Sequence, residues 1–224
     1  MTPELVVLDM AGTTVADDGL VVKAFTAAIA AVGVSEEDGR FPGMLKYVVD
    51  TMGQSKITVF RALLDDETSA QRANAAFERA YGDLVANGEC APIPGAEEVI
   101  QGLRESGVKV ALTTGFAPAT QQAILDALGW HDLADLALAP GEWVRGRPFP
   151  DLVLSAALRL QITDVRNIAV VGDTPSDVLS GLRAGASVVA GVLTGSGTRE
   201  DLAAATHVLE SVRDLPTLLE GASR

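Results

Sequence analysis

Acidic, hydroxyl and cationic residues follow several apolar runs of this sequence, and residues of these types can bind and transfer an oxyanion. The first run ends in Asp9 within the stretch "LDMAGTT", so one carboxylate enters a turn that contains Gly12 and Thr13. The other candidates that follow later runs are Thr114, Gly115, Arg147, Asp173 and Asp177. Carboxylates are ligands for Mg²⁺, hydroxyl groups and backbone N–H groups hold phosphoryl oxygens, and arginine neutralises a phosphoryl centre. The set suits a phosphoryl group and a divalent metal, with Asp9 as both nucleophile and metal ligand.

These residues meet only if the apolar runs are parallel strands. The predicted strands are Leu5–Leu8, Val108–Leu112, Leu136–Leu138, Ile168–Val171, Val188–Val192 and, more weakly, His207–Leu209. Helical spacing predicts helices between the later strands, at Ala96–Glu105, Ala119–Leu128, Asp151–Leu160 and Pro175–Ala184. Strands alternating with helices are typical of a Rossmann-like, doubly wound parallel α/β sheet. Ligands bind at the carboxyl ends of such strands, where the candidate residues lie.

The segment from 16 to 90 has a different pattern, because it is helical in period and composition and contains no good strand. It ends where Pro92, Pro94 and Gly95 interrupt any helix. We therefore predict an α/β core domain made of residues 1–15 and 91–224. An all-α cap domain, residues 16–90, is inserted after the first strand.

Composition excludes several classes of partner. Acidic residues number 30 against 17 basic ones, and the formal net charge is −13. Binding to nucleic acid or to an anionic membrane is not expected of such a chain. No charged-then-apolar leader opens the sequence, and no apolar run approaches the roughly 18 residues of a membrane span. We expect a cytoplasmic protein whose single cysteine, Cys90, forms no internal disulfide.

The order of the motifs resembles that of the haloacid dehalogenase superfamily. The matching motifs are "DMAGTT", "TTG", Arg147 in a position usually held by lysine, and "VGDTPSD". The resemblance implies a helical cap that closes over the site, Asp9 as the nucleophile and Thr114 as a phosphate ligand. It also implies that Asp173 and Asp177 belong to a Mg²⁺ site, to which Ala11 offers its backbone carbonyl.

Ala11 is a departure from the phosphatases of this superfamily, which carry a second aspartate there. That aspartate protonates the leaving alcohol, and a methyl group cannot do so. Three alternatives remain: a haloacid dehalogenase, a hydrolase of carbon–phosphorus bonds, or a protein without catalysis. The dehalogenases do not keep the aspartate that corresponds to Asp173, which disfavours the first alternative.

The phosphonoacetaldehyde hydrolase branch combines the alanine at this position with an arginine at the position of Arg147. Its cap motif is similar to "TMGQSKITVFRALL", which contains Met52, Gly53 and Lys56. The resemblance implies that Lys56 forms a Schiff base with the carbonyl group of the substrate. The iminium draws electrons from the carbon–phosphorus bond, so no alcohol leaves and no second acid is needed at Ala11.

Two residues depart from that branch: Val59 replaces a usual histidine, and Phe116 replaces a usual tyrosine. We therefore predict cleavage of a 2-oxo-phosphonate that need not be phosphonoacetaldehyde itself. Two alternatives are a phosphomonoesterase of a small phosphorylated metabolite and a non-catalytic phosphate-binding relative. The apolar segment Ala24–Val32 suggests a homodimer formed through the cap.

Overall fold

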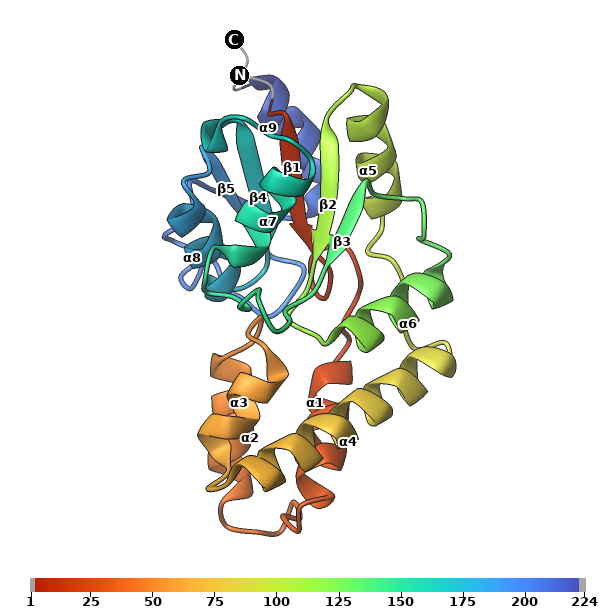
Figure 1. The fold of residues 1–224 in the computed structure, drawn as a ribbon, viewed down its shortest axis with the longest axis vertical. Helices are drawn as coiled ribbons and strands as arrows, with labels where there is room; N and C mark the ends of the chain where they lie inside the picture. The colour runs from red at the N-terminus through yellow and green to blue at the C-terminus, as the bar shows by residue number, and fades with distance from the viewer. Residues whose placement is uncertain (1–2, 222–224) are drawn as a thin grey trace.

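A parallel sheet is the centre of the computed structural model, which describes residues 3–221 (Figure 1). All strand pairs are parallel, and the strand order is β3-β2-β1-β4-β5-β6. The strands are β1 (Leu5–Asp9), β2 (Lys109–Thr113), β3 (Leu136–Leu138), β4 (Ile168–Gly172), β5 (Val188–Val192) and β6 (His207–Leu209). This order confirms the predicted doubly wound α/β sheet.

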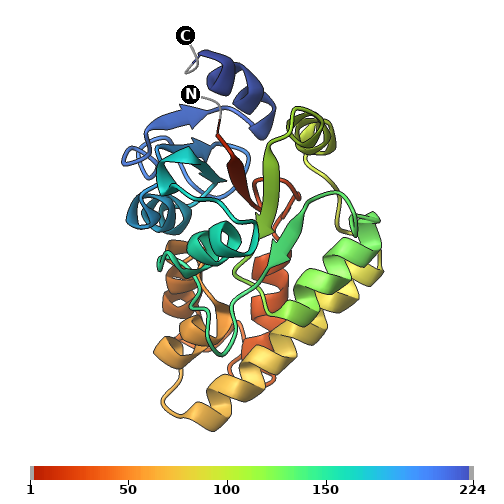
Figure 2. The same cartoon turned by 45° about the horizontal axis from the view of Figure 1, so that its top comes forward.

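Helices cover both faces of the sheet, which explains why strand β1 is buried along its whole length. Helices α5 (Ala96–Glu105) and α9 (Leu215–Gly221) share an apolar cluster with Val6 and Leu8, whereas Leu5 and Val7 face helix α7 (Asp151–Arg159). Helix α8 (Pro175–Ala184) packs on β4 and β5 (Figure 2). This part of the chain also contains α6 (Pro118–Leu128) and short 3₁₀ turns at Val165–Asn167 and Val212–Asp214.

Four helices lie beyond the edge at which the strands end, and we call them the cap helices (Figure 1). They are α1 (Leu20–Ala30), α2 (Phe41–Asp50), α3 (Lys56–Leu63) and α4 (Glu67–Ala86). Helix α2 was not singled out from its periodicity, because Pro42 and Gly43 occupy its first turn. The division of the chain into domains at residues 15 and 90 stays a prediction.

The apolar face of α1 is already buried within the chain. Ala24, Phe25, Ala28 and Ile29 are buried, and the helix packs on α4. A homodimer through the cap stays a prediction, but this helix face does not offer a surface for it. Among residues 3–221, no helix combines the length and hydropathy that crossing a membrane requires.

Aromatic rings connect the cap helices to the sheet. Phe25 stacks on Phe60, which meets Phe77 edge-on, and Phe77 lies 6.2 Å from Phe116 in the loop after β2. Helix α4 also runs along helix α6 in both ribbon views (Figures 1 and 2). Rings of this size contribute large buried areas, so the cap helices pack firmly against the sheet edge.

Candidate active site

A cavity of about 520 Å³ lies between the sheet edge and the cap helices. Ten of the twelve residues that the sequence singled out line it: Asp9, Ala11, Gly12, Met52, Gly53, Lys56, Thr114, Gly115, Arg147 and Asp173. The other two, Thr13 and Asp177, are buried behind its wall. Parallel pairing explains most of this convergence, because Asp9 lies level with Thr113, and β4 ends beside β1.

Arg147 holds two carboxylates together beneath the cavity. Its Nη2 lies 2.6 Å from Asp9 Oδ1, and its Nη1 lies 2.6 Å from Asp177 Oδ1. All three side chains are at most 5% exposed, so these are buried ion pairs. The second oxygen of Asp177 accepts hydrogen bonds from the N–H and hydroxyl groups of Thr174, which form a capping box at the start of α8. Asp177 therefore orients Arg147 and begins a helix.

Asp173 is held by a backbone N–H from one loop and a side-chain hydroxyl from another. Its Oδ2 accepts a hydrogen bond from the Ser196 N–H at 2.8 Å, and its Oδ1 lies 3.4 Å from the Thr13 hydroxyl. Gly12 has φ +89°, and a Cβ there would meet the Asp173 carboxylate at 2.6 Å. Glycine is thus required at position 12 both for its backbone conformation and for the close approach of Asp173.

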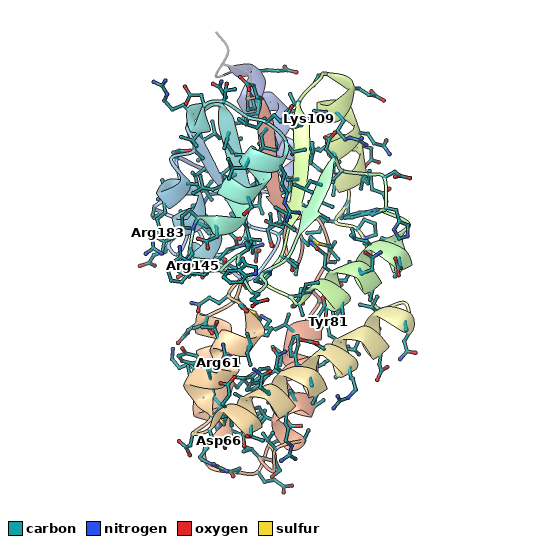
Figure 3. All side chains as sticks on the ribbon, in the orientation of Figure 1. Arg61, Asp66, Tyr81, Lys109, Arg145 and Arg183 are labelled. Carbon is teal, nitrogen blue, oxygen red and sulfur yellow. The ribbon has the colours of Figure 1, made fainter. Side chains whose placement is uncertain are left out.

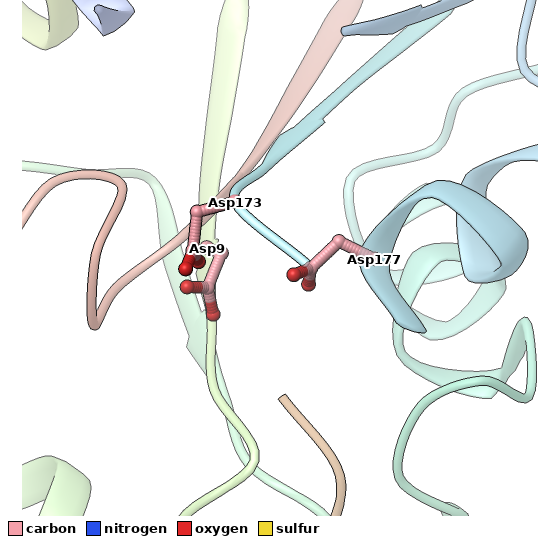
Figure 4. A group of neighbouring side chains, drawn as sticks. All are labelled: Asp9, Asp173 and Asp177. Atoms are coloured by element: carbon pink, nitrogen blue, oxygen red, sulfur yellow. The ribbon is translucent and has the colours of Figure 1, made fainter. Parts of the chain in front are cut away.

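The carboxylate cluster fits a divalent cation. Asp9, Asp173 and Asp177 each offer an oxygen within 4.8 Å of the others, and Figure 4 shows Asp9 and Asp173 side by side with Asp177 pointing toward them from α8. Three ionised carboxylates and one guanidinium leave two negative charges uncompensated. Burial, followed by the neighbouring carboxylates, raises the pKa of Asp9, and the same causes raise the pKa of Asp173 to about 6. Oxygen ligands carrying two excess charges are what Mg²⁺ prefers.

Lys56, the first residue of α3, is 8% exposed and lines the same cavity. In the part of the chain that the structure describes, the other three lysines each contact a carboxylate, whereas Lys56 forms no ion pair. Its Nζ lies 5.6 Å and 5.8 Å from the ring centroids of Phe116 and Phe77. Burial lowers the pKa of Lys56 to about 8, although Asp17 and Asp9 act in the opposite direction. At neutral pH roughly a tenth of this amine is unprotonated.

Glycines allow the loop before Lys56 to approach the sheet edge. A Cβ on Gly115 would lie 2.6 Å from the carbonyl oxygen of Gly53 and 2.8 Å from that of Gln54. Gly53 has φ +81° and packs against the Thr174 side chain, and Gly146 approaches Ser55. We call residues 53–55, which precede Lys56, the cap loop. Its close contacts with Gly115, Gly146 and Thr174 position Lys56 in addition to helix α3.

The two residues that depart from the phosphonoacetaldehyde hydrolase motif differ in position. Phe116 lines the cavity with Lys56, and its ring centroid lies 4.5 Å from that of Tyr81 with the two rings tilted. Val59 is 3% exposed, packs in the main apolar cluster and does not line the cavity. Position 59 thus contributes packing here.

The cavity residues that the sequence reasoning missed include Asp17, Asp18 and Ser196. Asp17 and Asp18 follow the turn after β1, and Ser196 follows β5. Ser196 was accessible to the rule that ligands bind after strand ends, because β5 ends at Val192. Asp17 carried no such signal, since its proximity to Lys56 depends on how α3 docks.

The geometry agrees with the comparisons to known proteins. The model of the haloacid dehalogenase-like hydrolase family matches residues 3–185. This chain belongs to that family. The chain is therefore a hydrolase of this family, and its relatives include phosphonoacetaldehyde hydrolases.

Similarity to known sequences and solved structures covers most of this haloacid dehalogenase-like hydrolase. It is 33% identical over 213 residues to phosphonoacetaldehyde hydrolase from Bordetella pertussis, covering 86% of this chain and 74% of that protein. A phosphonoacetaldehyde hydrolase-like protein from Oleispira antarctica superposes with a TM-score of 0.84 at 26% identity, covering 100% of this chain and 94% of that one. CbbY from Rhodobacter sphaeroides, solved with phosphate, shares the fold at a TM-score of 0.76 and 20% identity, covering 96% of each chain.

Proposed function

We propose that this hydrolase cleaves the carbon–phosphorus bond of a 2-oxo-phosphonate through a Lys56 imine and an Asp9 phosphoenzyme. The observation that carries the proposal is Lys56 itself: a buried amine without an ion pair, lining one cavity with the Asp9 carboxylate. A lysine with a lowered pKa is the form that attacks a carbonyl group. The named relatives from Bordetella pertussis and Oleispira antarctica support this substrate class.

The first step joins the neutral Lys56 amine to the substrate carbonyl carbon, and water leaves to form an iminium. Asp9 Oδ2 has no hydrogen-bond donor among the described residues, whereas Oδ1 is held by Arg147. That free oxygen attacks phosphorus while the electrons of the carbon–phosphorus bond move toward the iminium nitrogen and form an enamine. No alkoxide leaves, so the methyl group of Ala11 suffices where other family members need an acid.

The second half of the reaction returns both residues to their starting state. Water hydrolyses the aspartyl phosphate, and protonation of the enamine followed by hydrolysis of the imine frees Lys56. Thr114 and Gly115 line the cavity beside Asp9 and bind the phosphoryl oxygens. Asp9, Asp173 and the Ala11 carbonyl would hold Mg²⁺, with Asp177 behind them; when bound, the cation neutralises phosphoryl charge.

Borohydride reduction tests this proposal. With a 2-oxo-phosphonate present, borohydride is expected to fix the substrate carbon skeleton on Lys56, detected by peptide mass, and to stop phosphate release. Lys56→Arg keeps the charge but cannot form the imine, so both signals are lost. Lys46→Arg is the matched control, because Lys46 is exposed and pairs with Asp50.

Two outcomes would contradict the proposal. Phosphate release from the oxo-phosphonate by Lys56→Arg at the wild-type rate would exclude the imine. Hydrolysis of simple phosphate esters by Lys56→Arg, with no turnover of oxo-phosphonates by the wild type, would instead identify a phosphomonoesterase.

A further inference from the structure

Asp17 is a carboxylate that the proposed reaction has not used. It lies in the segment that leads from the turn after Asp9 into helix α1, and its side chain lines the cavity together with Lys56. It is half-buried, and its Oδ1 accepts a hydrogen bond from the Val21 N–H at 3.2 Å. The carboxylate is therefore oriented by the first turn of α1.

The electrostatic environment couples Asp17 to Lys56. Among the carboxylates that act on Lys56, Asp17 has the largest effect, ahead of Asp9 and Asp173. Lys56 in turn acts on Asp17, whose pKa is raised from its ordinary value mainly by burial. The other charged or titratable groups around the pair are Asp9, Arg147 and Asp173 on the core, Asp18 beside Asp17, Tyr81 on α4, and Cys90.

Formation of the iminium requires one proton that must come from a group other than the lysine and the substrate carbonyl. A neutral amine and a carbonyl group give an iminium and water only when one proton is added. Val59, at the position where related enzymes carry a histidine, has no titratable group and lies outside the cavity. The cavity wall next to Lys56 must therefore provide another proton donor.

We propose that Asp17 is the general acid and base of the Lys56 imine, an assignment that rests on the proposed function. The Lys56 nitrogen bonds to the carbonyl carbon, protonated Asp17 gives its proton to the departing oxygen, and water leaves. The products are an iminium and the Asp17 carboxylate, which face each other as an ion pair. When water later hydrolyses the imine, the same proton returns to Asp17 and leaves Lys56 neutral.

The test compares Asp17→Asn with wild type and with Asp65→Asn. Asparagine keeps an oxygen that accepts the Val21 hydrogen bond, but it cannot transfer a proton. We expect Asp17→Asn to lower the rate of borohydride trapping on Lys56, and of phosphate release, by about 10²-fold or more. Asp65→Asn removes the same charge from an exposed aspartate that does not line the cavity, and it is expected to keep the wild-type rate. Asp17→Glu, which retains the acid, is expected to recover part of the rate.

The outcomes separate this inference from the proposed function. Trapping in Asp17→Asn at the wild-type rate, with an unchanged pH profile, would overturn the role of Asp17 while leaving the imine in place. Absence of trapping in the wild type would overturn the imine first. If Asp17→Asn does not fold, Asp17→Ser keeps a hydrogen-bond acceptor near α1, and added formate is expected to restore its trapping rate; no restoration would count against the proposal.

Discussion

Substitution of Gly115 by alanine tests whether the close contact between Gly115 and the cap loop positions Lys56. The backbone of Gly115 is not in the left-handed region, so alanine is compatible with its conformation. The added Cβ would meet the carbonyl oxygens of Gly53 and Gln54 at 2.6 Å and 2.8 Å, where ordinary contact begins at 3.4 Å. Backbone oxygens cannot rotate away, so the loop that leads into Lys56 must retreat by roughly 0.8 Å or more.

The magnitude follows from the cost of overpacking. Inserting a methyl group into such a contact costs about 1–3 kcal/mol. We call the cap loop docked when it packs against Gly115 and undocked when it has moved away. The added methyl group destabilises only the docked state, so the undocked fraction of molecules is expected to rise about 5- to 150-fold. Lys56 is 8% exposed when docked, so its rate of acylation should rise in proportion.

The assay is acylation of Lys56 followed by peptide mass spectrometry, with the half-exposed Lys109 as the internal reference. This readout needs no substrate and does not depend on the proposed reaction. Gly82→Ala is the matched control, because Gly82 lies in α4 and a Cβ there meets nothing within 4 Å. Acylation of Lys56 in Gly115→Ala at the wild-type rate would refute the reasoning.

Three further predictions concern charge and burial. In Asp17→Asn, where no acid at position 17 titrates, the rate of imine trapping should rise about tenfold per pH unit up to no more than about pH 8 and then level off, because Lys56, whose pKa is lowered to about 8, must be neutral to react; a profile still rising at about pH 10 would contradict this. Mg²⁺ at about 100 times its dissociation constant should stabilise the folded wild type by about 2.7 kcal/mol, measured as a shift in melting temperature, and an equal shift in Asp173→Asn would argue against the carboxylate site. Tyr81→Phe should raise the free energy of unfolding by about 1 kcal/mol in denaturant titrations, because the hydroxyl of Tyr81, on α4 near the core, is buried without a partner among the described residues (Figure 3); a loss of stability would show that the hydroxyl has a partner.

The local sequence pattern was sufficient to predict the strands of the sheet and the site residues that follow them. Apolar runs identified all six strands within a residue at each end, and parallel pairing then required Asp9, Thr114 and Asp173 to lie at one edge. The helical period of the cap segment was equally local. Among the cap helices of the described residues, α2 was not predicted, because Pro42 and Gly43 obscure its first turn, and α9 was not predicted in the rest of that part of the chain.

The sequence did not predict which side chains contact each candidate residue. Nothing in the spacing required Arg147 to contact both Asp9 and Asp177, or placed Thr13 and Asp177 outside the cavity lining. These contacts join segments that are more than a hundred residues apart in the sequence or that are connected by loops. The path of such a loop depends on tertiary packing. Asp177 was expected as a metal ligand, and the structure shows that it also caps α8 and holds Arg147.

The sequence by itself determined the family motifs, the strand ends and the choice of Lys56 as a candidate site residue. Only the tertiary structure decided that Lys56 is buried, forms no ion pair among the described residues and lines one cavity with Asp17. The physical reason is that a lysine at the start of a helix is reactive or solvated according to what covers it. Here Phe77, Phe116 and the glycine contacts between loop and core supply that cover.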